Sequence, residues 1–163
     1  MQSLLRKNKV EMPDTSWYLQ TNKAYSMGSS SLFSCVTAIT VRDANSISRV
    51  NREEIANIKS FIHLSNNWDG YEAAPISRDA MEQAISFIHD INKYDIDVYL
   101  SSPGPNGEVM IQLKLGRKEI EFIFYSNKSK YVLFSNNEFQ SQAVYIPGLL
   151  TELVEWLIAD ATR

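Results

Sequence analysis

Cysteine is almost absent from this sequence: Cys35 is the only one among 163 residues. A chain with one cysteine cannot form an internal disulfide, which agrees with a reducing compartment. Cys35 lies in an apolar segment with no histidine nearby in the sequence. We therefore interpret it as a small packed side chain rather than as a catalytic nucleophile.

Long apolar runs are also lacking. No stretch reaches the roughly 18 residues that a membrane helix needs, and residues 1–9 do not contain the apolar core of a signal peptide. We therefore expect a cytoplasmic protein with no membrane partner.

The sequence lacks the motifs of several common enzyme classes. It has no glycine-rich phosphate loop, no Cys-x-x-Cys, no His-x-x-x-His and no Gly-x-Ser-x-Gly. The two histidines, His63 and His89, fall on different predicted helices, several turns apart along the axis of an antiparallel helix pair. We therefore expect no catalytic motif of these kinds, no metal site and no cofactor.

Positive charge is scarce in most of the chain. Residues 51–163 carry ten Lys and Arg against sixteen Asp and Glu, whereas residues 1–50 carry six against three. An acidic body repels phosphate, which argues against a nucleic-acid partner. Three aromatic residues suggest a stacking platform for single strands, but the basic groove that should accompany it is missing; they are Tyr125, Tyr131 and Phe134.

The first 48 residues differ in composition from the rest, being rich in Ser, Thr and Asn without a helical period. We predict that residues 1–48 form an extended or partly ordered arm, with one strand at 32–40, and that residues 49–163 form a single domain. The arm carries Trp17 and Tyr18, which are costly to leave in water, so we predict that they dock on the body or on a partner.

The rest of the chain predicts an α+β fold with two N-terminal helices, an antiparallel meander of about four strands and a C-terminal helix packed on one face of the sheet. The first helix should run from about Asn51, its predicted N-cap, to Ser65, with Ile62 in its apolar stripe. Ser77 should cap the second helix, and Pro147 should open the last one. The strands are expected at 97–101, 108–115, 119–124 and 130–134, with a short edge strand at 142–146.

The clearest pairing is a hairpin around Gly116-Arg117, a glycine-first turn of type II′. This turn places Leu113 opposite Ile120 on an apolar face and Lys114 opposite Glu119 on a polar face. The polar face mixes charged and apolar side chains, which suits either a protein interface or an ordinary wet surface; its residues are Met110, Gln112, Lys114, Glu119, Glu121 and Ile123.

The segment 66–75 joins the two predicted helices and is unusually rich in large side chains for a linker. In one interpretation Trp68 buries its ring, Asp69 accepts backbone N–H groups of the turn and Glu72 is solvated. In another, Asp69 and Glu72 act as an acid–base pair in a pocket beside Trp68 and Tyr71. As a binding surface, the same four residues would contact a partner.

The run LSNNWDGYEAAPIS at 64–77 resembles a family of small, functionally uncharacterised bacterial and phage proteins that carry an NWDGYGA-x-PIS signature between two helices. The resemblance extends from about 51 to 134, because SPGPNGE at 102–108 is similar to a P-x-P-x-GE turn in that family. Glu72 departs from the pattern, since the family usually has glycine there. The resemblance implies an accessory gene of mobile elements and of defence or toxin–antitoxin neighbourhoods.

These observations favour a non-enzymatic protein that binds another protein, in an antitoxin-like, inhibitor or immunity role. A basic toxin or nuclease is the candidate partner, because an acidic body complements a basic surface. Self-association into a homo-oligomer is left open. The alternative function is a small hydrolase-like enzyme that uses Asp69 and Glu72.

Overall fold

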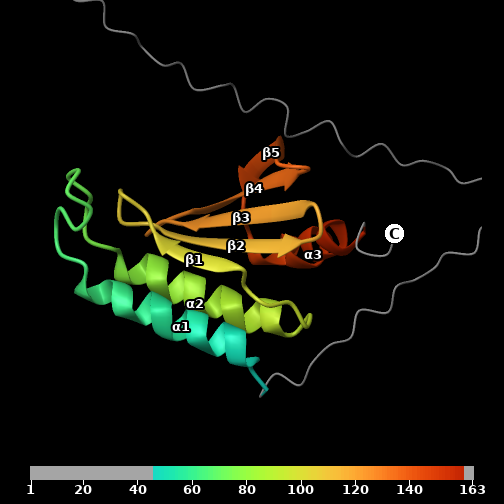
Figure 1. Ribbon diagram of the computed structural model, residues 1–163, viewed down its shortest axis with the longest axis horizontal. Coiled ribbons are helices and arrows are strands. Elements are labelled where there is room, and N and C mark those ends of the chain that lie inside the picture. Colours follow the sequence, from blue (N-terminus) through green and yellow to red (C-terminus); the bar gives the residue numbers. More distant parts are fainter. Residues whose placement is uncertain (1–45, 160–163) are drawn as a thin grey trace, which may run out of the picture. The chain divides into compact units, whose positions relative to one another are not determined.

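The computed structural model describes residues 46–159, so residues 1–45 of the predicted arm, with Trp17, Tyr18 and Cys35, lie outside the described part. Within the described part, three α-helices and five β-strands confirm the predicted α+β class (Figure 1). The helices are α1 (Arg49–Ser60), α2 (Arg78–Asn92) and α3 (Leu150–Ile158), with the 3₁₀ turns η2 (Phe61–His63) and η3 (Pro147–Leu149); the strands are β1 (Leu100–Pro103), β2 (Val109–Leu115), β3 (Lys118–Phe124), β4 (Ser129–Ser135) and β5 (Glu138–Val144).

The sheet is an antiparallel meander in which the strands lie in chain order, from β1 to β5. The prediction of about four strands was wrong, because β5 is a full strand of seven residues that begins at Glu138 rather than at Gln142. Six of its seven residues are exposed. A strand that is wet on both faces has no reason to alternate apolar and polar residues, and this alternation is the signal on which a strand prediction depends.

The β2–β3 hairpin has the predicted register. Leu113 pairs with Ile120 on the buried face, and Lys114 pairs with Glu119 on the other face, where the two side chains form an ion pair. Gly116 adopts a φ of 60°, whereas Arg117 is not among the residues with positive φ. That combination fits the predicted type II′ turn.

Helices α2 and α3 cover one face of the sheet, which we call the inner face, through contacts with β2 and β3. α1 packs beside α2 and along β1 (Figure 1). At the centre of the core, four aromatic rings contact one another in edge-to-face, tilted and stacked pairs, with ring centroids 4.3–6.4 Å apart; they are Phe87, Phe122, Phe124 and Tyr145. Such pairs add to the free energy gained by burying the rings.

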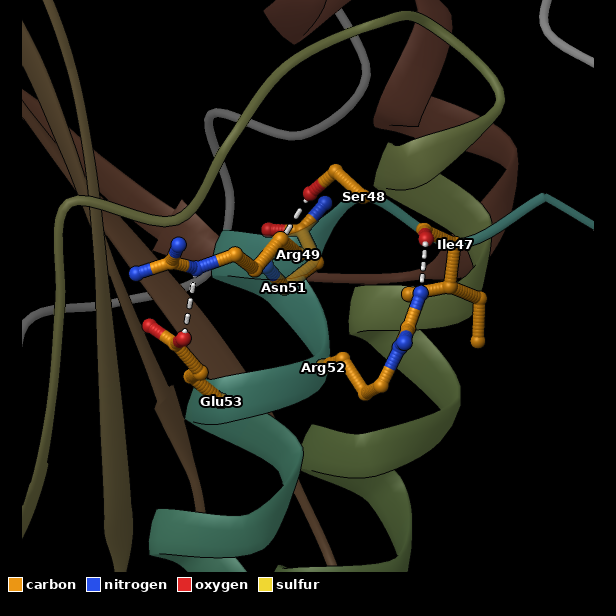
Figure 2. Close-up of polar contacts among 6 residues, drawn as sticks. All are labelled: Ile47, Ser48, Arg49, Asn51, Arg52 and Glu53. Atoms are coloured by element: carbon orange, nitrogen blue, oxygen red, sulfur yellow. Dashed lines mark hydrogen bonds and ion pairs between the residues drawn. The ribbon is translucent and has the colours of Figure 1, made fainter.

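The start of α1 differs from the prediction. Ser48, not Asn51, is the N-cap: its Oγ accepts a hydrogen bond of 3.0 Å from the backbone N–H of Asn51 (Figure 2). The helix also ends earlier than predicted, at Ser60, and gives way to η2. Ile62 consequently leaves the apolar stripe and is 47% exposed.

Asn51 instead lies completely buried and joins three segments of the chain. Its Oδ1 accepts the backbone N–H of Val98 at 2.8 Å, and its Nδ2 donates to the backbone oxygen of Ile96 and to Oδ1 of Asn92. Asn92, at the end of α2, donates in turn to the backbone oxygen of Ser46. The start of α1, the end of α2 and the approach to β1 are therefore held by one pair of buried amides.

We predict that Asn51→Ala lowers the free energy of unfolding by about 2–4 kcal/mol, because it leaves the buried Val98 N–H and the partly buried Ile96 carbonyl without their partner. Urea unfolding checks this. Asn127→Ala is the control, since Asn127 is exposed and should change stability by less than about 0.5 kcal/mol. Equal effects of the two substitutions would contradict the structural role of Asn51.

Candidate functional site

The loop between η2 and α2 is closed on itself by its own backbone. The N–H of Asn67 donates to the backbone oxygen of Ala73 at 2.7 Å, and the N–H of Gly70 donates to the backbone oxygen of Asn67 at 3.1 Å. The side-chain Oδ1 of Asn67 accepts the N–H of Glu72 at 2.8 Å. Three residues in this short segment have positive φ: Asn67, Gly70 and Glu72. The loop is therefore a defined structure rather than a slack connection.

Asp69 and Trp68 both act within the loop. One oxygen of Asp69 accepts the N–H groups of Tyr71 and Ala73, at 2.7 and 3.1 Å. The ring of Trp68 is half-buried, and its Nε1–H donates to the backbone oxygen of Ala74 at 3.1 Å. This arrangement agrees with the interpretation in which both side chains fold the turn. It gives no support to a catalytic role for Asp69, which stays an untested prediction.

A second turn, residues 103–108, holds the loop against the sheet. The N–H of Ala74 donates to the backbone oxygen of Pro105, and the N–H of Ser77 donates to that of Gly107, both at 2.8 Å. A Cβ on Gly107 would lie 2.7 Å from the backbone oxygen of Pro75, so the contact requires glycine. The two segments on which the family resemblance rests, 64–77 and 102–108, are thus in direct contact.

Tyr71 is the one large side chain of this loop that is free of the packing. It is 88% exposed, the highest value among the exposed large hydrophobic residues of the described part. The loop extends beyond the ends of α1 and α2 (Figure 1). An aromatic ring is thereby held in solvent on a backbone that hydrogen bonds fix on both sides.

Glu72 is exposed and adopts a φ of 69°. A residue with a Cβ is strained in this left-handed region, whereas glycine enters it freely. On backbone grounds alone, glycine would therefore suit this position better than glutamate. Glu72 carries a backbone strain that glycine would remove, and it directly follows Tyr71 in the chain.

We predict that Glu72→Gly is at least as stable as the natural protein and more stable than Glu72→Ala by about 0.5–1 kcal/mol. Glycine relieves the strain of positive φ but adds flexibility to the unfolded chain, so the two effects partly offset each other. Alanine is the matched variant, because it removes the same carboxylate and keeps the Cβ. Thermal and urea unfolding measure the stability of both variants. A Glu72→Gly variant that is less stable than Glu72→Ala would refute this account of the position.

The outer face of the sheet, opposite α2 and α3, is the second candidate surface. The predicted residues of the polar face lie there, and Gln112 and Lys114 both donate to the carboxylate of Glu119. A hollow of about 170 Å³ opens on this face between β1, β2 and β3. The sequence analysis did not predict the exposed apolar residues of the outer face. They come from the two edge strands: Leu100 is 50%, Phe139 59% and Val144 55% exposed.

The structure also argues against a stacking platform, because Phe134 and Tyr131 do not lie on one face of the sheet. Phe134 lies on the outer face and contacts Phe139, with ring centroids 6.4 Å apart. Tyr131 pairs with Phe122 in the β3–β4 ladder and therefore lies on the inner face. Because these rings point to opposite faces, they cannot stack successive bases together.

A groove of about 280 Å³ lies between α2 and the end of β5, with the ring of Tyr145 in its wall. Burial raises the pKa of the Tyr145 hydroxyl to about 12, and the nearby Asp90 and Tyr94 add to this shift. No residue of the loop 66–75 lines this groove or the hollow on the outer face. Neither space therefore provides the pocket that an Asp69–Glu72 enzyme would use.

The raised pKa of Tyr145 predicts a loss of stability at alkaline pH. Between about pH 10, where an unfolded tyrosine loses its proton, and about pH 12, the folded protein still holds that proton, so unfolding becomes more favourable as pH rises. Urea unfolding at about pH 9 and about pH 11.5 should show a larger decrease for the natural protein than for Tyr145→Phe, by about 1–2 kcal/mol. Equal decreases would contradict the desolvation of this hydroxyl.

His63 and His89 are both exposed. Among residues 46–159 there is no group of three or more His, Cys, Asp or Glu side chains placed to hold a metal ion. In the same range, no helix is long and apolar enough to cross a membrane.

Comparison with protein families, with curated proteins and with solved structures finds no match for this chain. The family resemblance of residues 51–134 therefore remains a prediction from the motifs alone.

Proposed function

We propose that this protein binds another protein through the loop 66–75, with Tyr71 as the central contact and Glu72 beside it. The observation that carries the proposal is the position of Tyr71, 88% exposed on a loop whose other large ring, Trp68, is hydrogen-bonded to the loop itself. Under this proposal Trp68 and Asp69 shape the surface, while Tyr71 and Glu72 contact the partner.

The physical reason is the cost of ordering a surface when it binds. Tyrosine provides a large contact area with few rotatable bonds, and tyrosine is enriched among the residues that dominate binding energy. A loop that is already fixed loses little conformational entropy on binding. An exposed ring on a preorganised loop is costly for a monomer and useful for recognition.

The kind of partner follows from charge and from the family resemblance. The acidic body, with sixteen carboxylates against ten basic residues over 51–163, favours a basic protein surface. An antitoxin-like, inhibitor or immunity role in a bacterial or phage conflict system, in the cytoplasm, fits this charge and the resemblance. A basic toxin or nuclease is the partner that we propose.

The experiment compares three full-length variants by affinity purification from the organism that encodes the protein, followed by mass spectrometry. Tyr71→Ala should lose the partner that the natural protein retains. Tyr99→Ala is the matched control, because Tyr99 is also exposed, at 60%, but lies just before β1. Trp68→Ala should lose stability as well as binding.

With the purified partner, calorimetry should show a dissociation constant at least 30-fold higher for Tyr71→Ala than for the natural protein. This is the loss of affinity expected when a residue contributes about 2 kcal/mol to binding. Its free energy of unfolding should stay within about 0.5 kcal/mol of the natural value, since the ring is solvated. A Tyr71→Ala variant that binds normally would refute the proposal, and a destabilised one would assign Tyr71 to the fold.

A further inference from the structure

The two edges of the sheet are treated very differently. At the β1 edge, Nδ2 of Asn57 in α1 donates to the backbone oxygen of Ser101 at 3.3 Å and to its Oγ at 3.0 Å, and the Ser101 hydroxyl donates to Glu54. The backbone of β1 is therefore covered by α1. At the opposite edge, six of the seven residues of β5 are exposed, and no described element pairs with the strand on that side.

The direction of the free backbone groups follows from one hydrogen bond. The N–H of Tyr145 donates to the backbone oxygen of Ser129, so Tyr145 faces β4. Backbone groups alternate in direction along an antiparallel strand. Ala143, paired with Tyr131, therefore also faces β4, whereas the N–H and C=O groups of Gln142 and Val144 point to the open edge.

Natural sheets usually protect such an edge with lysine, proline, a charge, a β-bulge or a covering segment. β5 has one register shift, between Phe139 and Ser141, and the strand after it, residues 141–144, pairs regularly with β4. β5 reads EFQSQAV: it has no proline or lysine, and its one charged residue, Glu138, stands at its first position. Three apolar side chains along this edge are exposed: Phe139 at 59%, Val144 at 55% and Ile146, two residues after the strand ends, at 56%. The edge thus combines open hydrogen-bonding groups with apolar side chains, the features that favour pairing with another strand.

We propose that β5 pairs antiparallel with β5 of a second copy of this chain, which joins the two sheets into one of ten strands. With the two-fold axis at Gln142, Gln142 of each copy exchanges two backbone hydrogen bonds with the other. The two Glu138 residues then lie at opposite ends of the strand pair, beyond the register shift that separates Phe139 from Ser141 in each copy. The single charge of the strand therefore does not oppose itself.

A second copy fits this edge because the regular part of β5 is complementary to itself. About an axis at Gln142, Ser141 of each copy lies opposite Ala143 of the other, so only uncharged side chains meet there.

The test is sedimentation velocity of the full-length protein over a range of concentrations. Because one strand pair with a few apolar side chains makes a small interface, we expect a dimer with a dissociation constant in the order of micromolar. Gln142→Pro removes the N–H that points to the open edge and leaves the bonds to β4, so it should weaken the dimer at least tenfold. Gln142→Thr is the matched control, because it changes the same side chain, keeps the N–H and should still dimerise.

Val144→Lys is a second variant, in case proline disturbs β5 itself, and it should weaken the dimer through a charge in the strand pair. Amide exchange at single-residue resolution provides an independent measurement. The N–H groups of Gln142 and Val144 should exchange more slowly as concentration rises, while that of Ala143, already bonded to β4, should not change. A protein that stays monomeric at several hundred micromolar would overturn the proposal, as would a folded Val144→Lys or Gln142→Pro variant that dimerises normally.

Discussion

The fold depends on a pair of buried amides. Asn51 and Asn92 are almost completely inaccessible, at 0% and 2% exposed, and between them they bond to the backbone at 46, 48, 96 and 98. A buried amide must satisfy both its donor and its acceptor, and it does so in few geometries. The pair therefore fixes how α1 lies against α2 and how the chain leaves α2 for β1. Apolar contacts supply most of the free energy of folding, but they do not set this geometry so narrowly.

The helix pair in turn places the loop 66–75. Its N-terminal end follows α1 through η2. Near its C-terminal end, Ala74 is bonded to the turn 103–108, which leads into β2, and Ser77, two residues after the loop, caps α2. Glu108, only 5% exposed, completes this turn by accepting the N–H of Asn106 at 2.8 Å. The loop is thus braced by both layers of the domain. The same residues that give the segment its signature also account for its rigidity, and Tyr71 is the exception that they leave in water.

Sequence reasoning succeeded where a local rule and a tertiary need agree. The β2–β3 register was predictable because Gly116 set the turn and the apolar alternation set the face. It failed where two residues satisfy the same local rule: Ser48 and Asn51 are both good N-caps, and only burial decides which one caps α1. It found only a short edge strand at 142–146 in place of β5, because most of an exposed edge strand carries no pattern. At the loop, the bonds of Asp69 were foreseen, but the exposure of Tyr71 and the positive φ of Glu72 depend on packing that no spacing reveals.

The open edge at β5 is a consequence of the topology. In a meander whose strands pair in chain order, the first and last strands must be the edges. The first edge lies where the chain has just left the helix pair, so α1 is available to cover it. After the last strand the chain turns at Pro147 and α3 crosses to the inner face, where Lys118 donates to the backbone oxygen of Trp156 near the end of the helix. That placement completes the core but leaves the last helix unable to shield β5. An order of elements that buries the inner face efficiently thus leaves one strand edge and the outer face of the sheet for other chains to cover.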